Sequence, residues 1–397
     1  MTSELVIRNN DVVVLAADSA LTVGNTKVFN GVSKLFELPG DFGVMISGDF
    51  DINGISAETL IKQFAKNKNF EKGNIFSIKD NLLTFIGENV PDTDFEKKTL
   101  SLLDSFKDYI QQEIGNGDDI ELISFLESMV DDLPLFIKEY EKNLDDFDYY
   151  FKKLIPSNVD AKNHLIILSF LKKIFLQYFV DSGTGIVIVG FNKKDFHSSR
   201  ISFNMYFNHN SHIEISDYEE SINFKGVEIF PVAQSDVIET FVFGIDPLVE
   251  ISIFNLFINF HNKCLNELRK DINSNTNIQS ESLNIVNHIF DDFDKTVISQ
   301  VNDFKKNFFI FKKMFVNKLL FFADALPKYE LADMAQYLIL LTALKRKINS
   351  NLNTVGGDID VAIITKGDGF IWRKHKEYSD TELNLQIPMK NLFELFK

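Results

Sequence analysis

Residues 2–48 read TSELVIRNNDVVVLAADSALTVGNTKVFNGVSKLFELPGDFGVMISG, and they predict a series of strands. Two β-rich runs, ELVIRN and DVVVLAAD, flank the Asn9-Asn10 pair, and asparagine tolerates the left-handed conformations that tight hairpins need. The run GVSKLFEL predicts a further strand that carries a lysine, and FGVMIS predicts a strand that ends at a glycine. Residue types with possible chemical roles therefore sit at strand ends: Thr2, Asp18, Lys34 and Gly48.

The spacing of these residues resembles that of proteasome β-type subunits and their bacterial HslV-like threonine-peptidase relatives. In that family a catalytic threonine is followed by an aspartate in a VVLAAD run, then by a lysine and by a glycine whose backbone N–H is a donor. Here Thr2 to Asp18 is 16 residues, Asp18 to Lys34 is 16, and Lys34 to Gly48 is 14, so no gap is needed.

Later segments extend the resemblance in the order of the family. TGIVIVGF and RISFNMYF are similar to its second-sheet hairpin, and a polar break at Ala233-Gln234-Ser235 precedes a short helix. VGGDIDVAIITKGDGF is similar to its closing hairpin, with Gly356-Gly357 allowing a close backbone approach. Together the similar segments are 2–68, 183–245 and 322–376.

The resemblance implies an α+β fold of the N-terminal nucleophile hydrolase type, a four-layer αββα sandwich that forms a single domain over residues 1–397. Helical spacing without strand alternation predicts two helical insertions, at about 70–157 and about 247–317. The apolar run HLIILSFLKKIFLQYF predicts a helix buried on the sheet. Residues 115–150 hold eleven acidic and two basic residues. That segment is either a solvated helical face or an acidic docking or gating surface.

Composition and charge narrow the possible partners and compartment. A net charge of −16 disfavours binding to nucleic acid or to an anionic membrane surface, because phosphates are repelled. Cys264 is the single cysteine, so an intramolecular disulfide is excluded and a reducing cytosol fits. The N-terminus has no signal-peptide pattern, and no apolar run approaches the ~20 residues of a membrane helix. We therefore expect a cytoplasmic protein.

The resemblance also implies a role for each site residue. Thr2 would be the nucleophile and, through its α-amine, the base, once Met1 is removed. Lys34 would stabilise developing negative charge, Asp18 would keep that lysine charged, and Gly48 would donate its N–H to the oxyanion. Two further residues, Thr22 and Ser47, would bind substrate.

Residues that usually support the threonine in the family differ here. An aspartate and a serine are usual just before the Gly-Gly pair, and those places hold Leu352 and Val355. An arginine is usual at Ala20. The residues that stand nearest to the supporting positions are Ser235, Asn353 and Thr354.

The sequence therefore predicts a threonine endopeptidase that acts on polypeptides. By resemblance we also expect a homo-oligomeric ring and an ATP-dependent unfoldase or another regulator as partners. Two alternatives stay open: a catalytically silent scaffold or binding subunit, and an N-terminal nucleophile amidase of small substrates. No cofactor or metal is expected, because His209 and His212 fit a loop and motifs such as HExxH are absent.

Overall fold

The structure is a computed structural model of the chain. It describes residues 3–23, 27–66, 74–91, 95–113, 123, 126–127, 144, 147–155, 159–207, 212–273, 280–349 and 355–376.

The first of two five-stranded sheets is built around the opening residues of the chain. Its strand order is β12-β1-β2-β13-β14, and every neighbouring pair is antiparallel. As predicted, the Asn9-Asn10 pair joins β1 to β2: the Asn9 side-chain oxygen accepts hydrogen bonds from the backbone N–H groups of Asp11 and Val12. The strands are β1 (Ser3–Arg8), β2 (Val12–Asp18), β12 (Glu228–Ala233), β13 (Ile359–Thr365) and β14 (Gly369–Lys374).

The second sheet has the order β11-β10-β9-β6-β5 and is also antiparallel. Its strands are β5 (Leu35–Leu38), β6 (Phe42–Gly48), β9 (Thr184–Gly190), β10 (Ser199–Phe207) and β11 (Ile213–Ser221). The sequence does not predict β11, because IEISDYEES is a polar edge strand with little apolar signal. Two small hairpins complete the strands: β3 (Leu21–Val23) with β4 (Lys27–Phe29), and β7 (Asp51–Ile52) with β8 (Ile55–Ser56).

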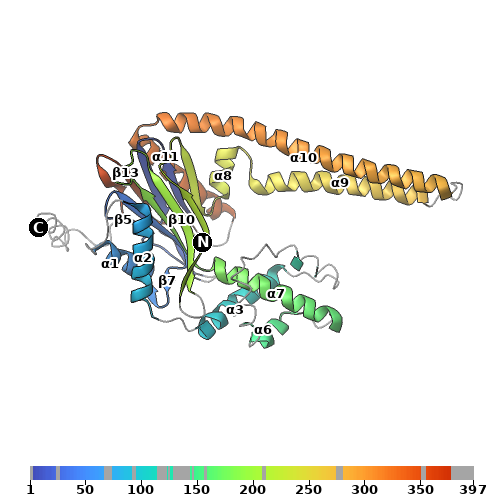
Figure 1. Ribbon diagram of the computed structural model, residues 1–397, viewed down its shortest axis with the longest axis horizontal. Coiled ribbons are helices and arrows are strands. Elements are labelled where there is room, and N and C mark those ends of the chain that lie inside the picture. Colours follow the sequence, from blue (N-terminus) through green and yellow to red (C-terminus); the bar gives the residue numbers. More distant parts are fainter. Residues whose placement is uncertain are drawn as a thin grey trace, which may run out of the picture.

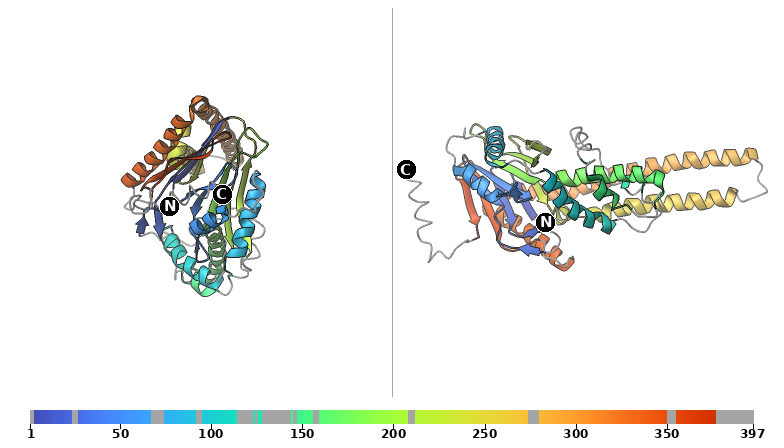
Figure 2. Two further views of the ribbon diagram at one scale, coloured as in Figure 1. Left: turned by 90° about the vertical axis from the view of Figure 1, so that its left-hand side faces the viewer. Right: turned by 90° about the horizontal axis from the view of Figure 1, so that it is seen from below.

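The two sheets face each other across a shared apolar core that includes Val6, Leu15, Met45 and Val187. Helices α8 (Asp236–Phe243) and α11 (Lys328–Asn349) bury side chains against the other face of the first sheet. Helices α1 (Ala57–Lys66) and α2 (Ile75–Asn89) do the same on the second sheet (Figure 2). The predicted mixed fold with antiparallel sheets is confirmed at this level.

A separate helical group lies beside the second sheet (Figure 1). It consists of α3 (Phe95–Glu113), α6 (Asp148–Lys152) and α7 (Ala161–Asp181), which share their own buried cluster. Helix α7 is the apolar run expected to lie on the sheet. Its buried face packs instead on α3 and α6, where the rings of Phe106 and Phe175 are 5.3 Å apart, and the cluster meets the sheet at Tyr206. Most of the acidic segment 115–150 lies outside the described residues.

A long helical hairpin projects from the sheets (Figure 1). It is formed by α9 (Pro247–Asn273) and the 46-residue α10 (Ser280–Ala325), which runs past the predicted end near 317. At its base, the Asn9 side-chain amide donates to the carbonyl oxygens of Ala323 and Asp324, both at 3.4 Å. Within the described residues no single helix has the length and hydropathy of a membrane span, although α8 and α9 pass that test together across a 73° bend.

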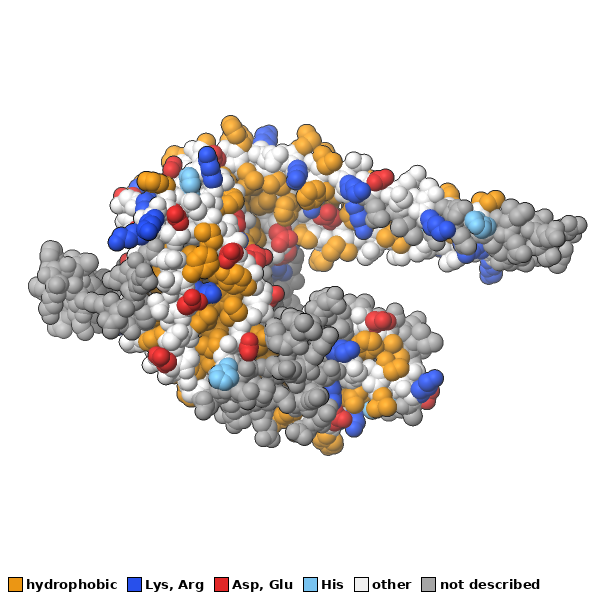
Figure 3. All heavy atoms as spheres, in the orientation of Figure 1, with side chains coloured by type: hydrophobic (Ala, Val, Ile, Leu, Met, Phe, Trp, Pro, Cys, Tyr) orange, Lys and Arg blue, Asp and Glu red, His pale blue; other side chains and the backbone are white. Residues whose placement is uncertain are grey.

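Large apolar side chains are exposed along this hairpin (Figure 3). Part of its seam is aromatic, with the Phe254 ring 5.8 Å from that of Phe304. Other large apolar side chains face solvent, and exposed apolar surface can mark an interaction site. They include Leu256, Phe257, Phe260, Phe309, Phe311, Met314, Phe321 and Phe322.

A buried arginine fastens the two sheets together at the end of β1. The Arg8 Nε donates to Glu228 at 2.7 Å, and its Nη1 donates to the carbonyl oxygens of Ser198 and Ser221. Arg200 also donates to both oxygens of Glu228, at 3.0 and 3.1 Å. Burial alone would raise the pKa of Glu228, but the hydrogen bonds and charges of the two arginines hold it below its usual value.

We predict that Glu228→Gln lowers the free energy of unfolding by about 2 kcal/mol, because it leaves the buried Arg8 without its counter-charge. Urea denaturation measures the change. The matched control is Glu58→Gln, which removes the exposed Lys62–Glu58 pair and is expected to change stability by no more than about 0.5 kcal/mol. Equal losses in the two variants would show that Arg8 does not depend on Glu228.

Candidate active site

Asp18 is the centre of the candidate site. It lies at the end of β2 and is 1% exposed, and its carboxylate accepts hydrogen bonds from a buried lysine and from backbone amides. Lys34 Nζ lies 2.5 Å from Asp18 Oδ1, and the side chains of both residues have no solvent exposure. An ion pair this deeply buried is stable only with further hydrogen bonds, which the backbone supplies.

The first of these backbone donors is the start of β1. The Ser3 amide donates to Asp18 Oδ1 at 3.0 Å, so one carboxylate oxygen binds both Lys34 and the beginning of the strand. Thr2 itself lies outside the described residues. It is bonded to Ser3, however, so the predicted nucleophile is one peptide bond from an amide that Asp18 fixes.

The second donor comes from the Gly-Gly pair near the C-terminal end of the fold. The Gly356 amide donates to Asp18 Oδ2 at 2.9 Å, and the Ser19 amide donates to the Gly356 carbonyl oxygen at 3.2 Å. Gly357 has φ +74°, and a Cβ on it would lie 2.4 Å from the Ser19 Oγ. Only glycine allows the backbone to come this close to Ser19, as the sequence predicts for the Gly356-Gly357 pair.

Lys34 is held from its backbone as well as from its side chain. Its carbonyl oxygen accepts from the Ile46 amide at 2.8 Å, which ties it to β6. Just before it, the Val32 carbonyl oxygen accepts from Lys376 Nζ at 2.5 Å, and the same Nζ lies 2.9 Å from buried Asp360. The loop that carries Lys34 is therefore fastened to the end of β14.

The sequence does not predict the roles of Asp360 and Lys376. The sequence feature that could have indicated them is the acidic residue inside the apolar run IDVAIIT. A carboxylate buried in such a run needs hydrogen-bond or ion-pair partners. Burial alone would raise the pKa of Asp360, but hydrogen bonds from His375 and Lys376 hold it below its usual value.

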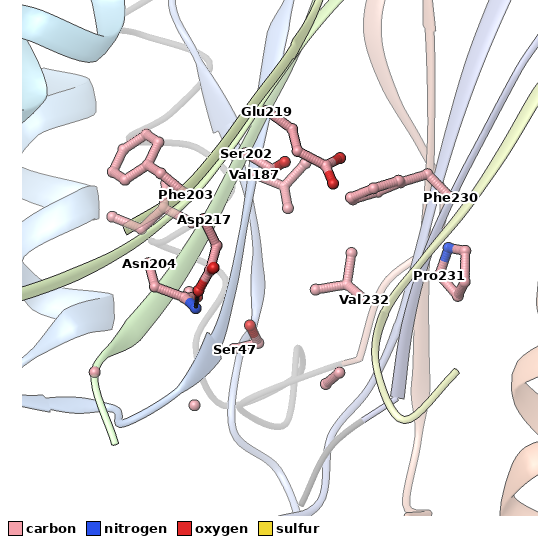
Figure 4. Close-up of a pocket in the computed structure, with 15 residues that line it drawn as sticks. Ser47, Val187, Ser202, Phe203, Asn204, Asp217, Glu219, Phe230, Pro231 and Val232 are labelled. Atoms are coloured by element: carbon pink, nitrogen blue, oxygen red, sulfur yellow. Dashed lines mark hydrogen bonds between the residues drawn. The ribbon is translucent and has the colours of Figure 1, made fainter. Parts of the chain in front are cut away.

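Ser47 and Gly48 end β6. Gly48 has φ +74°, and a Cβ there would lie 2.4 Å from the Gly183 carbonyl oxygen. The chain therefore needs glycine at the position predicted to bind an oxyanion. The Ser47 side chain is 8% exposed and lines a cavity between the sheets, together with Gly48 and Ala233 (Figure 4). Ala233 pairs with Ser3, so this cavity begins beside the start of β1.

The other predicted residues are less closely connected. Thr22 pairs with Val28 through the backbone of the β3–β4 hairpin. Ser235 stands before α8 without a side-chain capping hydrogen bond. Asn353, Thr354 and Leu352 lie outside the described residues, and Val355 is buried. Within the described ranges, no three His, Cys, Asp or Glu side chains form a group that could hold a metal ion.

Comparison with known proteins gives distant similarities. No protein-family model and no curated protein matches the chain. Among solved structures it is similar to Anbu (ancestral beta-subunit) from Yersinia bercovieri, at 10% identity and a TM-score of 0.31 over 99% of this chain and 96% of that one. It is also similar to Anbu from Hyphomicrobium sp. strain MC1, at 10% identity and a TM-score of 0.30 over 100% and 96%.

These matches correct the resemblance drawn from the sequence. The similar structures are Anbu proteins, a family distinct from the HslV-like peptidases, so the identification with HslV-like enzymes is wrong. The resemblance rests on the 16-, 16- and 14-residue intervals and on short sequence runs around them. Matches this short do not distinguish related families. At TM-scores of 0.29 to 0.31 the similarities establish neither family nor activity for this chain.

We predict that Gly48→Ala lowers the free energy of unfolding by about 3 kcal/mol, because it combines positive-φ strain with a clash against the Gly183 carbonyl. The matched control is Gly54→Ala: Gly54 has φ +87° but open space around its Cβ position, so only the strain of about 1 kcal/mol applies. Thermal or urea unfolding compares the two. A loss for Gly48→Ala no larger than the control's would mean that β6 can move away from Gly183.

Proposed function

We propose that this protein is a proteasome-like subunit that hydrolyses polypeptides with Thr2 as its N-terminal nucleophile. The observation that carries the proposal is the shared oxygen of Asp18, which binds both Lys34 and the Ser3 amide. This arrangement holds the Lys34 side chain beside the start of β1. A fixed cation next to a hydroxyl stabilises the negative charge that develops when the hydroxyl loses its proton.

The proposed reaction needs a free α-amine on Thr2 and therefore removal of Met1. The Thr2 hydroxyl attacks the carbonyl carbon of the substrate peptide bond while the α-amine takes the hydroxyl proton. The C–N bond then breaks, the leaving amine receives that proton, and the acyl group stays on Thr2 as an ester until water hydrolyses it. An N–H such as that of Gly48, aimed at the oxyanion, contributes roughly 3 kcal/mol to such a step.

The same proposal extends to the architecture and assembly. The two facing sheets, with α8 and α11 outside one and α1 and α2 outside the other, support a four-layer αββα sandwich of the N-terminal nucleophile type. We propose a homo-oligomer in the cytoplasm that receives polypeptides from an unfoldase or another regulator. Support for an assembly comes from the apolar surface of the α9–α10 hairpin, which other copies of this chain would cover.

We predict that the purified protein begins at Thr2 and forms one covalent adduct with a threonine-reactive peptide epoxyketone. Intact mass spectrometry detects both. Thr2→Ala is expected to abolish the adduct, and Lys34→Met to slow its formation by at least tenfold, because the hydroxyl loses its stabilising charge. The exposed Thr59→Ala variant is the control and should label like the natural protein. Retained Met1, or an adduct that survives Thr2→Ala, would contradict the proposal.

The exposed hairpin favours a second candidate function, a catalytically silent subunit that serves in assembly. Phe260 and Phe321 are 71% and 73% exposed, so replacing them with glutamate should leave the fold intact. We predict that the Phe260→Glu, Phe321→Glu double variant shifts native mass from an oligomer to the monomer. Lys263→Glu on the same hairpin is the control for charge. A natural protein that is already monomeric would remove this support for an assembly, whether or not Thr2 is reactive.

A further inference from the structure

The cavity beside Ser47 has the dimensions and position of a substrate pocket. It has a volume of about 370 Å³ and lies between the second sheet and β12 of the first (Figure 4). Ser47, Gly48 and Ala233 lie at one end, and Ala233 pairs with Ser3 in the sheet. The cavity therefore starts where the candidate site is and runs between the two sheets.

Small residues keep the entrance of this cavity open. A Cβ on Gly185 would lie 2.3 Å from the Ser47 Oγ and 3.2 Å from the Asn204 Oδ1, so a larger residue would fill the space. Ala233, at the facing strand, has φ +64°, which is uncommon for a residue with a Cβ. Backbone conformations of this kind persist where the surrounding structure holds them.

Ser47 presents a hydroxyl to the cavity. The residue is 8% exposed and lines the cavity with Gly48 and Gly185. Figure 4 shows the Ser47 oxygen pointing into the space between the sheets. A hydroxyl at the wall of a cavity can donate to or accept from a polar group of a ligand.

The β11 side of the cavity combines apolar walls with carboxylates. Val187, Phe230 and Val232 line its sides, and Asp217 and Glu219 of β11 face it (Figure 4). None of the described residues that line it is Lys or Arg.

The two carboxylates differ in their partners. In the described part of the chain Asp217 accepts hydrogen bonds from two neutral groups, the side chains of Asn204 and Ser216. Glu219 is 61% exposed and lies 3.5 Å from Arg200, which also donates to Ser202 of the cavity lining at 2.8 Å. Exposed carboxylates at the edge of an apolar cavity suit a lysine or arginine side chain, whose aliphatic stem packs on apolar groups while its cationic end reaches a carboxylate.

We propose that this cavity binds a lysine or arginine side chain of the polypeptide substrate close to the bond that is cut. Asp217 and Glu219 select the positive charge, and Ser47 hydrogen-bonds the substrate near the strand end. This inference rests on the proposed function, because it names the substrate class of the same site.

The test measures peptide binding to the full-length Thr2→Ala variant, so that no cleavage is needed. Fluorescence anisotropy compares two labelled peptides that differ at one position, lysine against norleucine, which has a similar stem and no charge. We expect the lysine peptide to bind at least tenfold more tightly, the ratio that about 1.4 kcal/mol represents. Adding Asp217→Asn and Glu219→Gln should reduce the ratio to less than threefold.

Glu220→Gln is the matched control, because Glu220 lies on the same strand, pairs with the Tyr218 hydroxyl and does not line the cavity. It should keep the tenfold ratio, and urea midpoints should show that all variants are folded. Equal binding of the two peptides, or a ratio that survives the double substitution, would overturn the pocket. If Thr2 fails to react with the epoxyketone while the lysine preference is present, the hydrolase proposal fails and the pocket stands as a binding site. If Thr2 reacts without such a preference, only the pocket fails.

Discussion

The buried pair of Asp18 and Lys34 is the constraint on which the rest of the site depends. Two charges removed from water are costly, so the fold has to surround them with donors and acceptors. The Ser3 and Gly356 amides provide these donors, and they come from opposite ends of the chain. The site can therefore form only when β1, β2 and the segment before β13 are all in place.

Much of this arrangement was predictable because it is local or periodic. The runs around Asn9-Asn10 predict β1 and β2, and the glycine pair predicts a close backbone approach near Asp18. The fastening of the Lys34 loop by Asp360 and Lys376 was not predictable, since it joins residues 344 positions apart through one carbonyl oxygen. For the same reason the sequence misplaces α7: its apolar run reports that the helix is buried, but not which elements bury it. The predicted HslV-like family was wrong because matching intervals indicate a type of site and do not identify the family that carries it.

The two ends of the paired sheets have different chemistry. At one end, Arg8 and Arg200 converge on Glu228 and join strands of both sheets with direct ion pairs. Towards the other, glycines at positions 48, 183 and 185 leave space between the sheets, and carboxylates from β11 face that space. Arg200 belongs to both regions, because it pairs with Glu228 and also contacts Ser202 and Glu219 of the cavity lining. The ion pairs that join the sheets therefore also hold one wall of the cavity in place.

The hairpin and the candidate site share the first two strands of the fold. With 46 residues at a rise of 1.5 Å each, α10 is about 69 Å long. The base of the hairpin is bonded to Asn9 in the turn between β1 and β2, and two residues later the chain continues as α11, which packs on the same strands. The far ends of those two strands carry the Ser3 amide and Asp18. The base of the hairpin and the buried ion pair therefore lie at opposite ends of the same two strands.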